Sequence, residues 1–528
     1  MMAKSEPNKW IVVITVVSAA LLQLIDTSIV NVTLTQMMGN LGASLGDISW
    51  VVTGYGAANV VMITLSGWLS SKFGRKNYFT ASIVLFTIAS IFCGTSTSVS
   101  ELIIFRIIQG IGGGGLLSTG QAILIDTFPK EELGKANAVF GMGVIIGPSI
   151  GPTLGGYITD HLSWNWVFYI NIPVGIIASI LAVLYVKESE HNQKTGKMDW
   201  LALMMLIVTI GALQVVLEKG ESEDWFETRY ITILTISFVL AGIIFVWRQL
   251  TVDHPILNLR LLKNRQFAVG SFFSFIQGVG LDASVFVVPV FCQTMLGYNS
   301  QDTGNLLMPG SLAAGMMMPV VAVLMKKTKI SPVLLAGIGF SLFIVFVWQL
   351  SGMSLSTGAN DFFWPLILRG VGLGLLFIPL LTITIAPLEG KDISQGTALT
   401  NTLRQLGGSF GIAAATTFIS VRNIFHYNNL TEHVSVYNQP TYDRLNSLTA
   451  LFVSKGSDIN TAQLKAAAAM KGTVFKQSML LTYNDVFLIV GVFFAICIPL
   501  LLLFKAKKKT VEGQVKEGEE QHMEMVME

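Results

Sequence analysis

The sequence reads WIVVITVVSAALLQLIDTSIVNVTLTQM over residues 10–37. Residues 11–34 are apolar and numerous enough to cross a bilayer as a helix, which takes about 20 residues. Asp26 lies near the middle of this segment. A carboxylate at membrane depth is costly, so it must face a bundle interior or a wet cavity, and such residues usually serve an ion or proton pathway. The alternative is a structural Asp held by the hydroxyls of Thr27 or Ser28. The rarity of such residues favours the proton pathway.

The composition places the chain in a membrane. Of its 528 residues, 52% are hydrophobic and 12% are charged, whereas a soluble protein carries about 25% charged residues. We therefore predict a protein that crosses the bilayer many times. The net charge of +2 is too small to suggest nucleic acid as a partner. Cys93, Cys292 and Cys497 lie in apolar runs, so no disulfide framework is expected.

Apolar segments of spanning length recur along the whole chain, about fourteen in all. They predict an all-α polytopic membrane protein. The segments lie near residues 10–37, 48–71, 77–97, 101–126, 136–159, 164–186, 200–217, 230–248, 267–290, 303–325, 331–350, 362–388, 397–420 and 482–504. No small-residue cleavage site follows the first segment, so it is expected to be a retained helix and not a signal peptide.

Basic residues are concentrated in alternate loops, which sets the orientation in the membrane. The Lys and Arg residues gather at 72–76, 130–135, 187–197, 248–265, 326–329 and 391, and in the tail from 505 to 509. The opposite short loops hold almost none, only Lys219 and Arg229, and the loop with these two residues is otherwise acidic. Because basic loops stay on the cytoplasmic side, both termini are predicted to be cytoplasmic.

One outer loop, residues 422–481, is much longer than the others. Its second half, Thr461–Met479, is rich in Ala and has the pattern of an exposed helix. The last residues, Val511–Glu528, are acidic and polar and are expected to be disordered.

A weak internal repeat divides the chain into two halves. LIDTS at 24–28 is echoed by GLDAS at 280–284, and the segment that begins at Arg106 is echoed by the one that begins at Arg369. Two plain apolar segments between residues 200 and 248 separate the halves. Parallel repeats with a site at their interface are a transporter architecture. Asp282 therefore becomes a counterpart of Asp26.

The fourth segment carries Arg106, Gln109, Gly110 and Gly113 at i, i+3, i+4 and i+7, which places them on one helical face. An Arg at membrane depth must pair with an acid, a carbonyl or water. It could simply tie neighbouring helices together, or its permanent charge could tune the proton affinity of a nearby acid. The second hypothesis is favoured because Asp26 lies in the same half and needs a partner.

The fifth segment has an unusual run of small residues and prolines. The run comprises Gly143, Gly147, Pro148, Gly151, Pro152, Gly155 and Gly156. Small residues every four positions let two helix backbones approach closely, and prolines bend the helix by removing hydrogen bonds. A tight crossing without mechanism would explain each glycine singly. The whole run predicts a bending, sliding contact.

These patterns, in this order, resemble the major facilitator superfamily. The basic turn at 67–76 matches its loop motif, 106–113 its fourth-span motif, and 151–156 the fifth-span motif of its antiporters. The segments at 26–32, 164–173 and 404–408 look like those of the fourteen-span drug:proton antiporters, the EmrB/QacA-like group. Two residues depart from the pattern. Ser71 stands where the loop motif usually has Asp, which puts that loop's charge-relay role in doubt, and Asn165 stands where Arg is common.

The resemblance implies the major facilitator fold, with two six-helix bundles plus two extra central helices. Residues 1–9 would be a cytoplasmic N-terminus, 10–186 the N-terminal bundle, 187–197 a cytoplasmic loop, 198–248 the two extra helices, 249–266 a cytoplasmic linker, 267–504 the C-terminal bundle with the long outer loop 422–481, and 505–528 a cytoplasmic tail. It also implies a bacterial cytoplasmic (inner) membrane. Some fourteen-span exporters hand their substrate to a periplasmic adaptor protein, so 422–481 could dock such a partner; an inert insertion is the equal alternative, because long loops are well tolerated.

The implied function is proton-driven antiport that exports amphipathic, cationic, drug-like compounds across the lipid bilayer by alternating access. The candidates for proton coupling are Asp26, Arg106 and Asp282. Those for the substrate pathway are Gln23, Asn31, Gln109, Met142, Phe286, Met308 and Arg369, of which the Met and Phe residues suit an adaptable apolar pocket, with core or lipid-facing packing as the alternative for each. The conformational motif is Gly147, Pro148, Gly151, Pro152, Gly155 and Gly156, and the loop motif is Gly67, Lys72, Gly74 and Arg75.

Other functions find less support. No Gly-rich phosphate loop ending in Lys-Ser/Thr occurs, so ATP is not expected as the energy source, and no zinc-binding His-Glu-x-x-His pattern occurs. We expect no cofactor and no metal. Export of fatty acids, siderophores or another lipophilic metabolite remains an alternative. A membrane-embedded lipid enzyme is less favoured, because no acid, His or Ser cluster marks a catalytic site at one membrane face. An uptake symporter on the same fold is less favoured only because the fifth-segment Gly/Pro run resembles that of antiporters.

Overall fold

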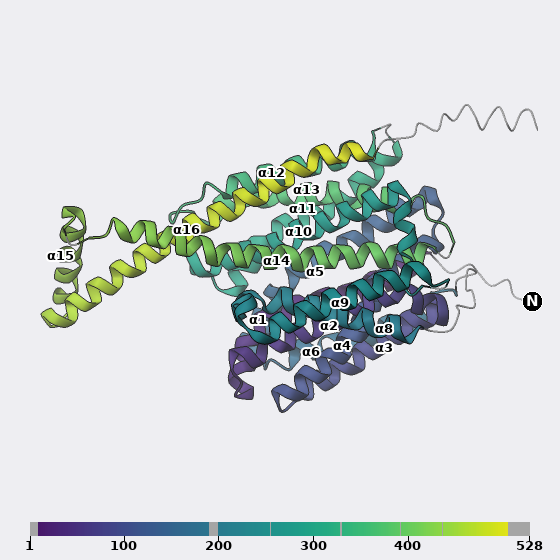
Figure 1. The fold of residues 1–528 in the computed structure, drawn as a ribbon, viewed down its shortest axis with the longest axis horizontal. Helices are drawn as coiled ribbons and strands as arrows, with labels where there is room; N and C mark the ends of the chain where they lie inside the picture. The colour runs from purple at the N-terminus through teal and green to yellow at the C-terminus, as the bar shows by residue number, and fades with distance from the viewer. Residues whose placement is uncertain are drawn as a thin grey trace, which may run out of the picture.

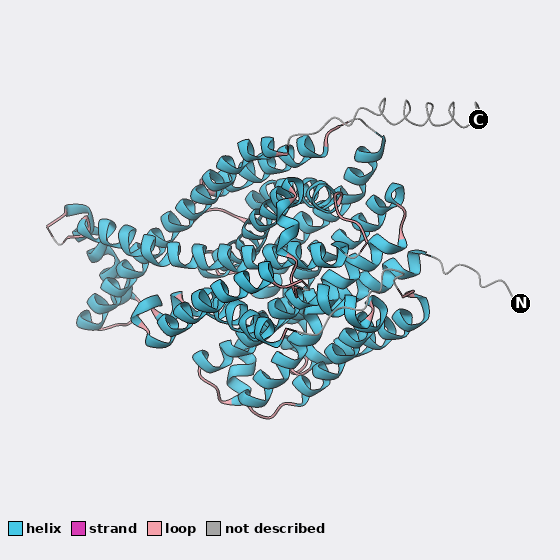
Figure 2. Ribbon diagram, turned by 45° about the vertical axis from the view of Figure 1, so that its right-hand side comes forward, coloured by secondary structure: helices cyan, strands magenta, loops and turns pink. Residues whose placement is uncertain are grey.

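The computed structural model describes residues 9–188, 199–253, 255–327, 330–390, 392–435 and 437–504. Within these ranges the regular structure is entirely helical (Figure 2). The expected N-terminal segment 1–9, the loop 187–197 and the tail 505–528 lie almost wholly outside the described residues.

Two groups of long helices pack along a common direction (Figure 1). The first group is α1 (Lys9–Leu41), α2 (Leu45–Phe73), α3 (Arg75–Thr95), α4 (Val99–Thr127), α5 (Lys130–His161), α6 (Trp166–Tyr169) and α7 (Asn171–Tyr185). The second group is α10 (Arg265–Met295), α11 (Ser300–Lys327), α12 (Pro332–Leu350), α13 (Ala359–Ile385), α14 (Asp392–Glu432) and α16 (Ile459–Leu500). Between them in sequence lie α8 (Trp200–Lys219) and α9 (Arg229–Thr251), and α15 (Gln439–Ser454) lies between α14 and α16.

Short polar segments start and stop these helices. The Ser44 hydroxyl accepts a hydrogen bond from the Asp47 backbone N–H and caps α2, and Asp199 and Asp458 cap α8 and α16 in the same way. Gly74, with φ +89°, makes the sharp turn from α2 into α3, a backbone conformation that favours glycine. Short 3₁₀ turns fill several connections: Glu221–Glu223, Trp225–Glu227, Leu259–Lys263 and Leu501–Leu503.

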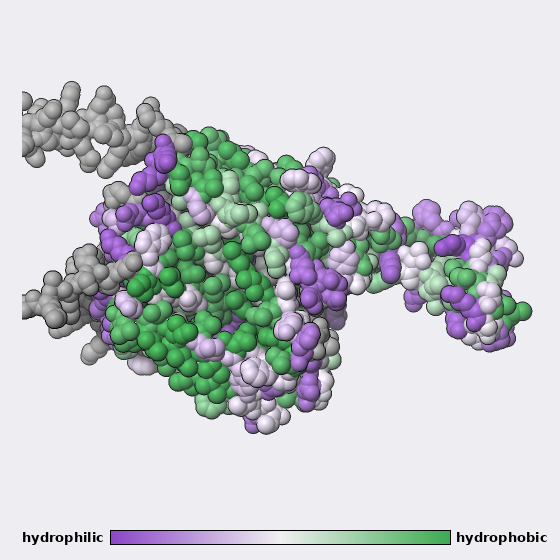
Figure 3. Space-filling view, turned by 180° about the vertical axis from the view of Figure 1, so that it is seen from behind, coloured by the Kyte–Doolittle hydropathy of each residue, from purple (hydrophilic) through white to green (hydrophobic). Residues whose placement is uncertain are grey.

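Most of the helices can cross a membrane. Twelve helices of the described residues are long and apolar enough, α6 and α7 together counting as one, and the bent α5 raises the number to thirteen. The two parts of α5 meet at 42°, as its internal prolines lead one to expect. The outside of the bundle is an apolar belt between two polar ends (Figure 3). The outer faces of α7 and α9 contribute to the exposed apolar residues, including Ile180, Leu184 and Ile243.

Helix α14 is too polar to count among those spans, yet it runs through the middle of the bundle (Figure 1). It packs against α10 of its own group and against α2, α4 and α8. Its buried residues are mostly small or polar, among them Thr397, Thr400, Asn401 and Gly408. A helix that is covered by protein on several sides does not need the apolar surface that lipid demands, which explains why α14 is absent from those spans although the sequence predicted one near 397–420.

Both ends of the described chain lie on one face of the bundle, which distinguishes that face from the opposite one. We call the face with Lys9 and Phe504 the terminal face, and the opposite face, from which α15 projects, the hairpin face (Figure 1). The described part of residues 422–481 is mostly helical and not an open loop, and α15 lies within it as a separate helix. Helix α14 continues to Glu432, and α16 runs unbroken from Ile459 through the predicted exposed helix and into the last span.

Candidate functional site

Asp26 on α1 is held inside the first helix group by residues of two neighbouring helices. The Asp26 side chain on α1 is fully buried, and its Oδ2 lies 2.5 Å from Nη1 of Arg106 on α4. Its Oδ1 accepts hydrogen bonds from Nε2 of Gln109 at 3.0 Å and from Nδ2 of Asn171 on α7 at 2.8 Å. Both carboxylate oxygens therefore have donors, and α1, α4 and α7 meet at one residue.

Arg106 is equally enclosed. Its Nη1 also donates to Oε1 of Gln109 at 2.7 Å, and its Nε donates to the carbonyl of Val51 on α2 at 3.4 Å. Its guanidinium carbon lies 4.0 Å from the centre of the Tyr55 ring, close enough for a cation–π interaction. Gln109 in turn donates to the Ser90 hydroxyl on α3 at 2.8 Å. The charge pair thus lies within a network that joins five helices, α1, α2, α3, α4 and α7.

The neighbouring hydroxyls of α1 do not hold Asp26. Thr27 donates to the carbonyl of Gln23 at 2.9 Å, and Ser28 donates to carbonyls of its own helix. The alternative of a structural Asp satisfied by these hydroxyls is therefore not what the structure shows. A buried ion pair of this kind is expensive to break, because removing one partner leaves the other charge uncompensated and costs about 3–5 kcal/mol.

The other predicted residues of the first group lie around this network. Gln109 belongs to the network and not to an open pathway. Gln23 is buried, but its Nε2 donates to Oδ1 of Asn59 at 3.2 Å. Asn31 is exposed, farther along α1. Asn171 had no assigned role in the sequence, although it lies in the segment 164–173 that carried the family resemblance.

The glycines of α5 pack against the part of α1 that carries Asp26. A Cβ on Gly147 would lie 2.9 Å from Cβ of Leu24, and one on Gly155 would lie 2.8 Å from Cγ1 of Ile29. A Cβ on Gly151 would overlap the side chain of Ser28. The stripe therefore places α5 directly on α1, on both sides of Asp26 in the sequence.

The same helix, α5, reaches the second group. Gly304 on α11 approaches Thr153, and Gly315 on α11 lies 2.9 Å, measured from its ideal Cβ, from Cδ1 of Ile146. Gly156 faces Gln301, with the closest contact of its ideal Cβ at 3.5 Å. Helix α5 thus lies between the helix with the buried acid and the opposite half of the protein.

The basic turn at 67–76 links the two groups near the terminal face. Arg75 forms an ion pair with Asp126 at the end of α4 and donates to the carbonyl of Gly390 in the second group at 3.5 Å. An ideal Cβ on Gly67 would lie 2.9 Å from the carbonyl oxygen of Ser394 on α14. Lys72 lies over the Trp68 ring at 4.5 Å.

Ser71 donates its hydroxyl to the Gly67 carbonyl at 2.8 Å. It therefore bonds its own helix in the position where the loop motif usually has Asp.

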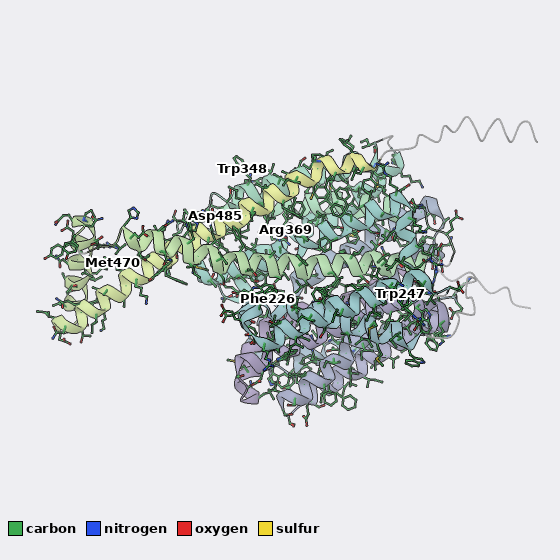
Figure 4. All side chains as sticks on the ribbon, viewed as in Figure 1. Phe226, Trp247, Trp348, Arg369, Met470 and Asp485 are labelled. Carbon is green, nitrogen blue, oxygen red and sulfur yellow. The ribbon has the colours of Figure 1, made fainter. Side chains whose placement is uncertain are left out.

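The second group does not reproduce the buried ion pair. Asp282 on α10 packs against Gly408 of α14, and Arg369 on α13 is buried without an ion pair to any described carboxylate (Figure 4). The basic residue that interacts electrostatically with Asp282 is Arg404 of α14, beyond ion-pair distance. The internal repeat therefore extends to the helix positions but not to the pairing of their charges.

A narrow cavity lies between the two groups, lined by α4, α5, α10, α13 and α14. Arg404 is its ionisable residue among the described ones, and its polar wall also includes Ser274, Gln277 and Thr400. None of the predicted pathway residues lines it. Met142 and Phe286 pack half-buried against the apolar core, and Met308 is 38% exposed.

The family follows from comparison with known proteins. The model of the Major Facilitator Superfamily matches residues 16–412. The chain belongs to this superfamily. A solved structure of the human organic anion transporter MFSD10 (TETRAN) has the same fold, with a TM-score of 0.57 and 15% identity, and covers 92% of this chain and 100% of that one. The predicted fold class, a polytopic all-α protein of the major facilitator fold, is confirmed.

Two curated relatives are similar over nearly their whole length. The multidrug export protein EmrB of Escherichia coli K12 is 31% identical over 89% of this chain and 90% of its own. The fatty acid resistance protein FarB of Neisseria gonorrhoeae is 30% identical over 92% of this chain and 94% of its own. The superfamily member described here is therefore a multi-pass membrane transporter of the EmrB-like multidrug-exporter type and not an enzyme, as predicted.

The contact between α5 and α1 yields a first prediction. Gly151→Ala forces the two helices apart, because even one added carbon overlaps Ser28, and overpacking of this kind costs about 1–3 kcal/mol. We expect the variant to insert and bind cargo but to lose most of its turnover in proteoliposomes. Gly211→Ala on α8 is the matched control, since its Cβ meets nothing within 4 Å. Equal turnover in the two variants would show that the contact does not limit transport.

Proposed function

We propose that this transporter is a proton-coupled antiporter that exports lipophilic, amphipathic compounds by alternating access. The observation that carries the proposal is the fully buried Asp26, paired with Arg106 at 2.5 Å inside the membrane-spanning bundle. A buried carboxylate in a spanning helix is expensive, and proton relays are the usual reason for one. In this proposal Asp26 takes up and releases the coupling proton, and Arg106 replaces that proton as its partner.

The helix packing suggests how protonation of Asp26 could drive the movement that transports cargo. Protonation of Asp26 would weaken its ion pair with Arg106, and with it the contacts that hold α1, α4 and α7 together. Helix α1 would transmit the change to α5 through the glycine stripe, and α5 contacts α11 of the other half. The superfamily's alternating access requires the two halves to move against each other, so this is the element on which a proton could act.

In this state the halves are joined near the terminal face. The hydroxyls of Thr64 on α2 and Thr402 on α14 lie 3.1 Å apart, and Nδ2 of Asn401 donates to Oε1 of Gln121 on α4 at 2.9 Å. We propose that the terminal face is cytoplasmic, since the ends of the described chain, Lys9 and Phe504, and basic residues such as Lys72, Arg75 and Lys326 belong to it. Loading of cargo from the cytoplasm would then require these contacts to open.

Lipophilic acids are a second candidate cargo beside cationic drugs. The observation that favours them is the cavity between the halves, whose ionisable lining residue is Arg404, with no carboxylate beside it in the lining. The relative from Neisseria gonorrhoeae is named for fatty acid resistance. Cationic cargo would need an acid that the lining does not offer.

The experiment that tests proton coupling uses proteoliposomes with an imposed pH gradient. Asp26→Asn keeps the size of the side chain but cannot ionise, so transport against a concentration gradient should be lost while the protein still inserts. The matched control is Asp302→Asn, which removes an exposed carboxylate from the first turn of α11 and should transport like the wild type.

A double variant distinguishes loss of proton coupling from misfolding. Asp26→Asn leaves Arg106 buried without its partner, which costs about 3–5 kcal/mol, whereas Asp26→Asn combined with Arg106→Gln removes both charges. We expect the double variant to recover thermal stability yet remain unable to use the pH gradient. Uphill transport at the wild-type rate in either variant would refute the assignment of the proton to Asp26.

We further propose that a periplasmic adaptor protein docks on the helical hairpin that projects from the bundle. This hairpin consists of the end of α14, of α15 and of the start of α16. Its tip stands clear of the bundle (Figure 4), and α15 has no buried residue. Large apolar side chains are nevertheless exposed along it, among them Tyr437, Leu451, Ile459 and Leu464. Exposed apolar side chains in such number are typical of a surface that another protein covers.

The base of the hairpin allows a clean test. Arg422 and His426 on α14 both bond Oδ2 of Asp485 on α16, at 2.5 and 2.7 Å, so the two helices are clamped where they leave the bundle. Replacing residues 433–474 with a Gly/Ser linker keeps this clamp. Transport in proteoliposomes should be unchanged, whereas drug resistance of cells should fall to the level of the empty vector. Full resistance with the linker in place would rule out docking through the hairpin.

A further inference from the structure

The cavity between the halves has two chemically different walls. Its apolar side is formed by Leu117 and Phe140 with Val144, Phe377 and Leu381, which come from α4, α5 and α13. Its polar side comes from α10 and α14 and includes Ser274, Gln277, Thr400 and Arg404. One wall is apolar and the other polar, which matches a ligand that is itself amphipathic. The cavity measures only about 20 Å³ in this state, room for little more than one water, so such a ligand would enter only when the two halves move apart.

The polar wall offers hydrogen-bond donors without an acid. Thr400 and Arg404 stand one turn apart on α14, and therefore on the same face. The buried Thr400 hydroxyl has no hydrogen-bond partner. Arg404 forms no ion pair within the described residues, and the carboxylate of Asp282, with which it interacts electrostatically, lies beyond ion-pair distance and packs on Gly408. A guanidinium and a hydroxyl are thus left to face the cavity.

An unpaired guanidinium on the wall of the cavity favours the binding of an anion there. A half-buried charge gains stability when it is paired, and guanidinium binds carboxylates through two parallel hydrogen bonds. Arg404 is half-buried, and Arg369, a buried arginine of the same half, does not line the cavity. The charge available to a ligand in the cavity therefore comes from Arg404.

We propose that this cavity binds amphipathic carboxylates, with the carboxylate on Arg404 and Thr400 and the apolar tail against Phe140 and Phe377. The inference deepens the proposed export function, because it makes Arg404 the residue that selects acidic over cationic cargo. In this proposal the proton binds in the first half of the protein, and the carboxylate of the cargo binds in the second half.

The test is direct binding to the purified protein in nanodiscs, which needs neither a pH gradient nor turnover. The probes are dansyl-labelled undecanoate and dansyl-labelled undecylamine, which share a tail and differ in the sign of the head group. The wild type should bind the acid at least about tenfold more tightly than the amine, as a charge-assisted hydrogen bond implies. Arg404→Gln should abolish that preference, and Arg404→Lys should retain part of it.

Two further variants make the outcome decisive. Arg369→Gln, the matched loss of a buried arginine outside the cavity, should keep the preference for the acid. Gln277→Glu adds a carboxylate to the lining and should shift the preference towards the amine. Equal binding of both probes to the wild type, or an unchanged preference in Arg404→Gln, would overturn the proposal. Loss of proton-driven transport with the preference intact would instead count against the proposed antiport alone.

Discussion

The buried charge pair of Asp26 and Arg106 is the constraint on which the first half of the structure depends. Two charges with almost no exposure, 0% and 1%, can remain inside a membrane-spanning bundle only while they neutralise each other and keep their hydrogen bonds. That requirement fixes α1, α4 and α7 against one another through Gln109 and Asn171. Protonation of Asp26 would therefore weaken contacts among three helices.

The two halves use similar helix positions for different tasks. The first half has a closed ion-pair network and a glycine stripe that places α5 against it. The second half has arginines without ion-paired carboxylates, and one of them, Arg404, faces the cavity between the halves. Helices α5 and α14 are the elements that each contact both halves closely. Proton and cargo would thus be bound at separate places and coupled through helix packing, with no residue that touches both.

The sequence predicted the helical architecture and part of the network well. An acid in the first span and an Arg–Gln face in the fourth are rare enough in lipid to indicate each other as partners. Asn171 was missed because an amide on a short apolar helix carries no charge that demands a partner. Arg404 stood in a quoted motif without a role, since sequence alone does not show which helix faces lie on a cavity. The exposed helix at Thr461–Met479 was expected to continue towards residues 483–485, and α16 does run on through them into the last span.

The inserted helices are more closely integrated than their plain sequence suggested. Nε2 of Gln214 on α8 donates to the Ser409 hydroxyl on α14 at 2.8 Å, and Nζ of Lys219, at the end of the same helix, donates to the Gly46 carbonyl at the start of α2 at 3.4 Å. Helix α8 therefore contacts both halves on the side of the hairpin face, while α9 lies outside it with few buried residues. Any movement of one half against the other has to accommodate α8.

The central claim, that Asp26 exchanges its proton when cargo binds, is tested most directly by measuring proton release on binding. Purified protein in a weakly buffered solution with a pH indicator dye would be mixed with saturating cargo across a range of starting pH values. The account predicts a release of protons from the wild type that is absent from the variant lacking both Asp26 and Arg106 charges, although that variant still binds cargo. The same release from both proteins would contradict it.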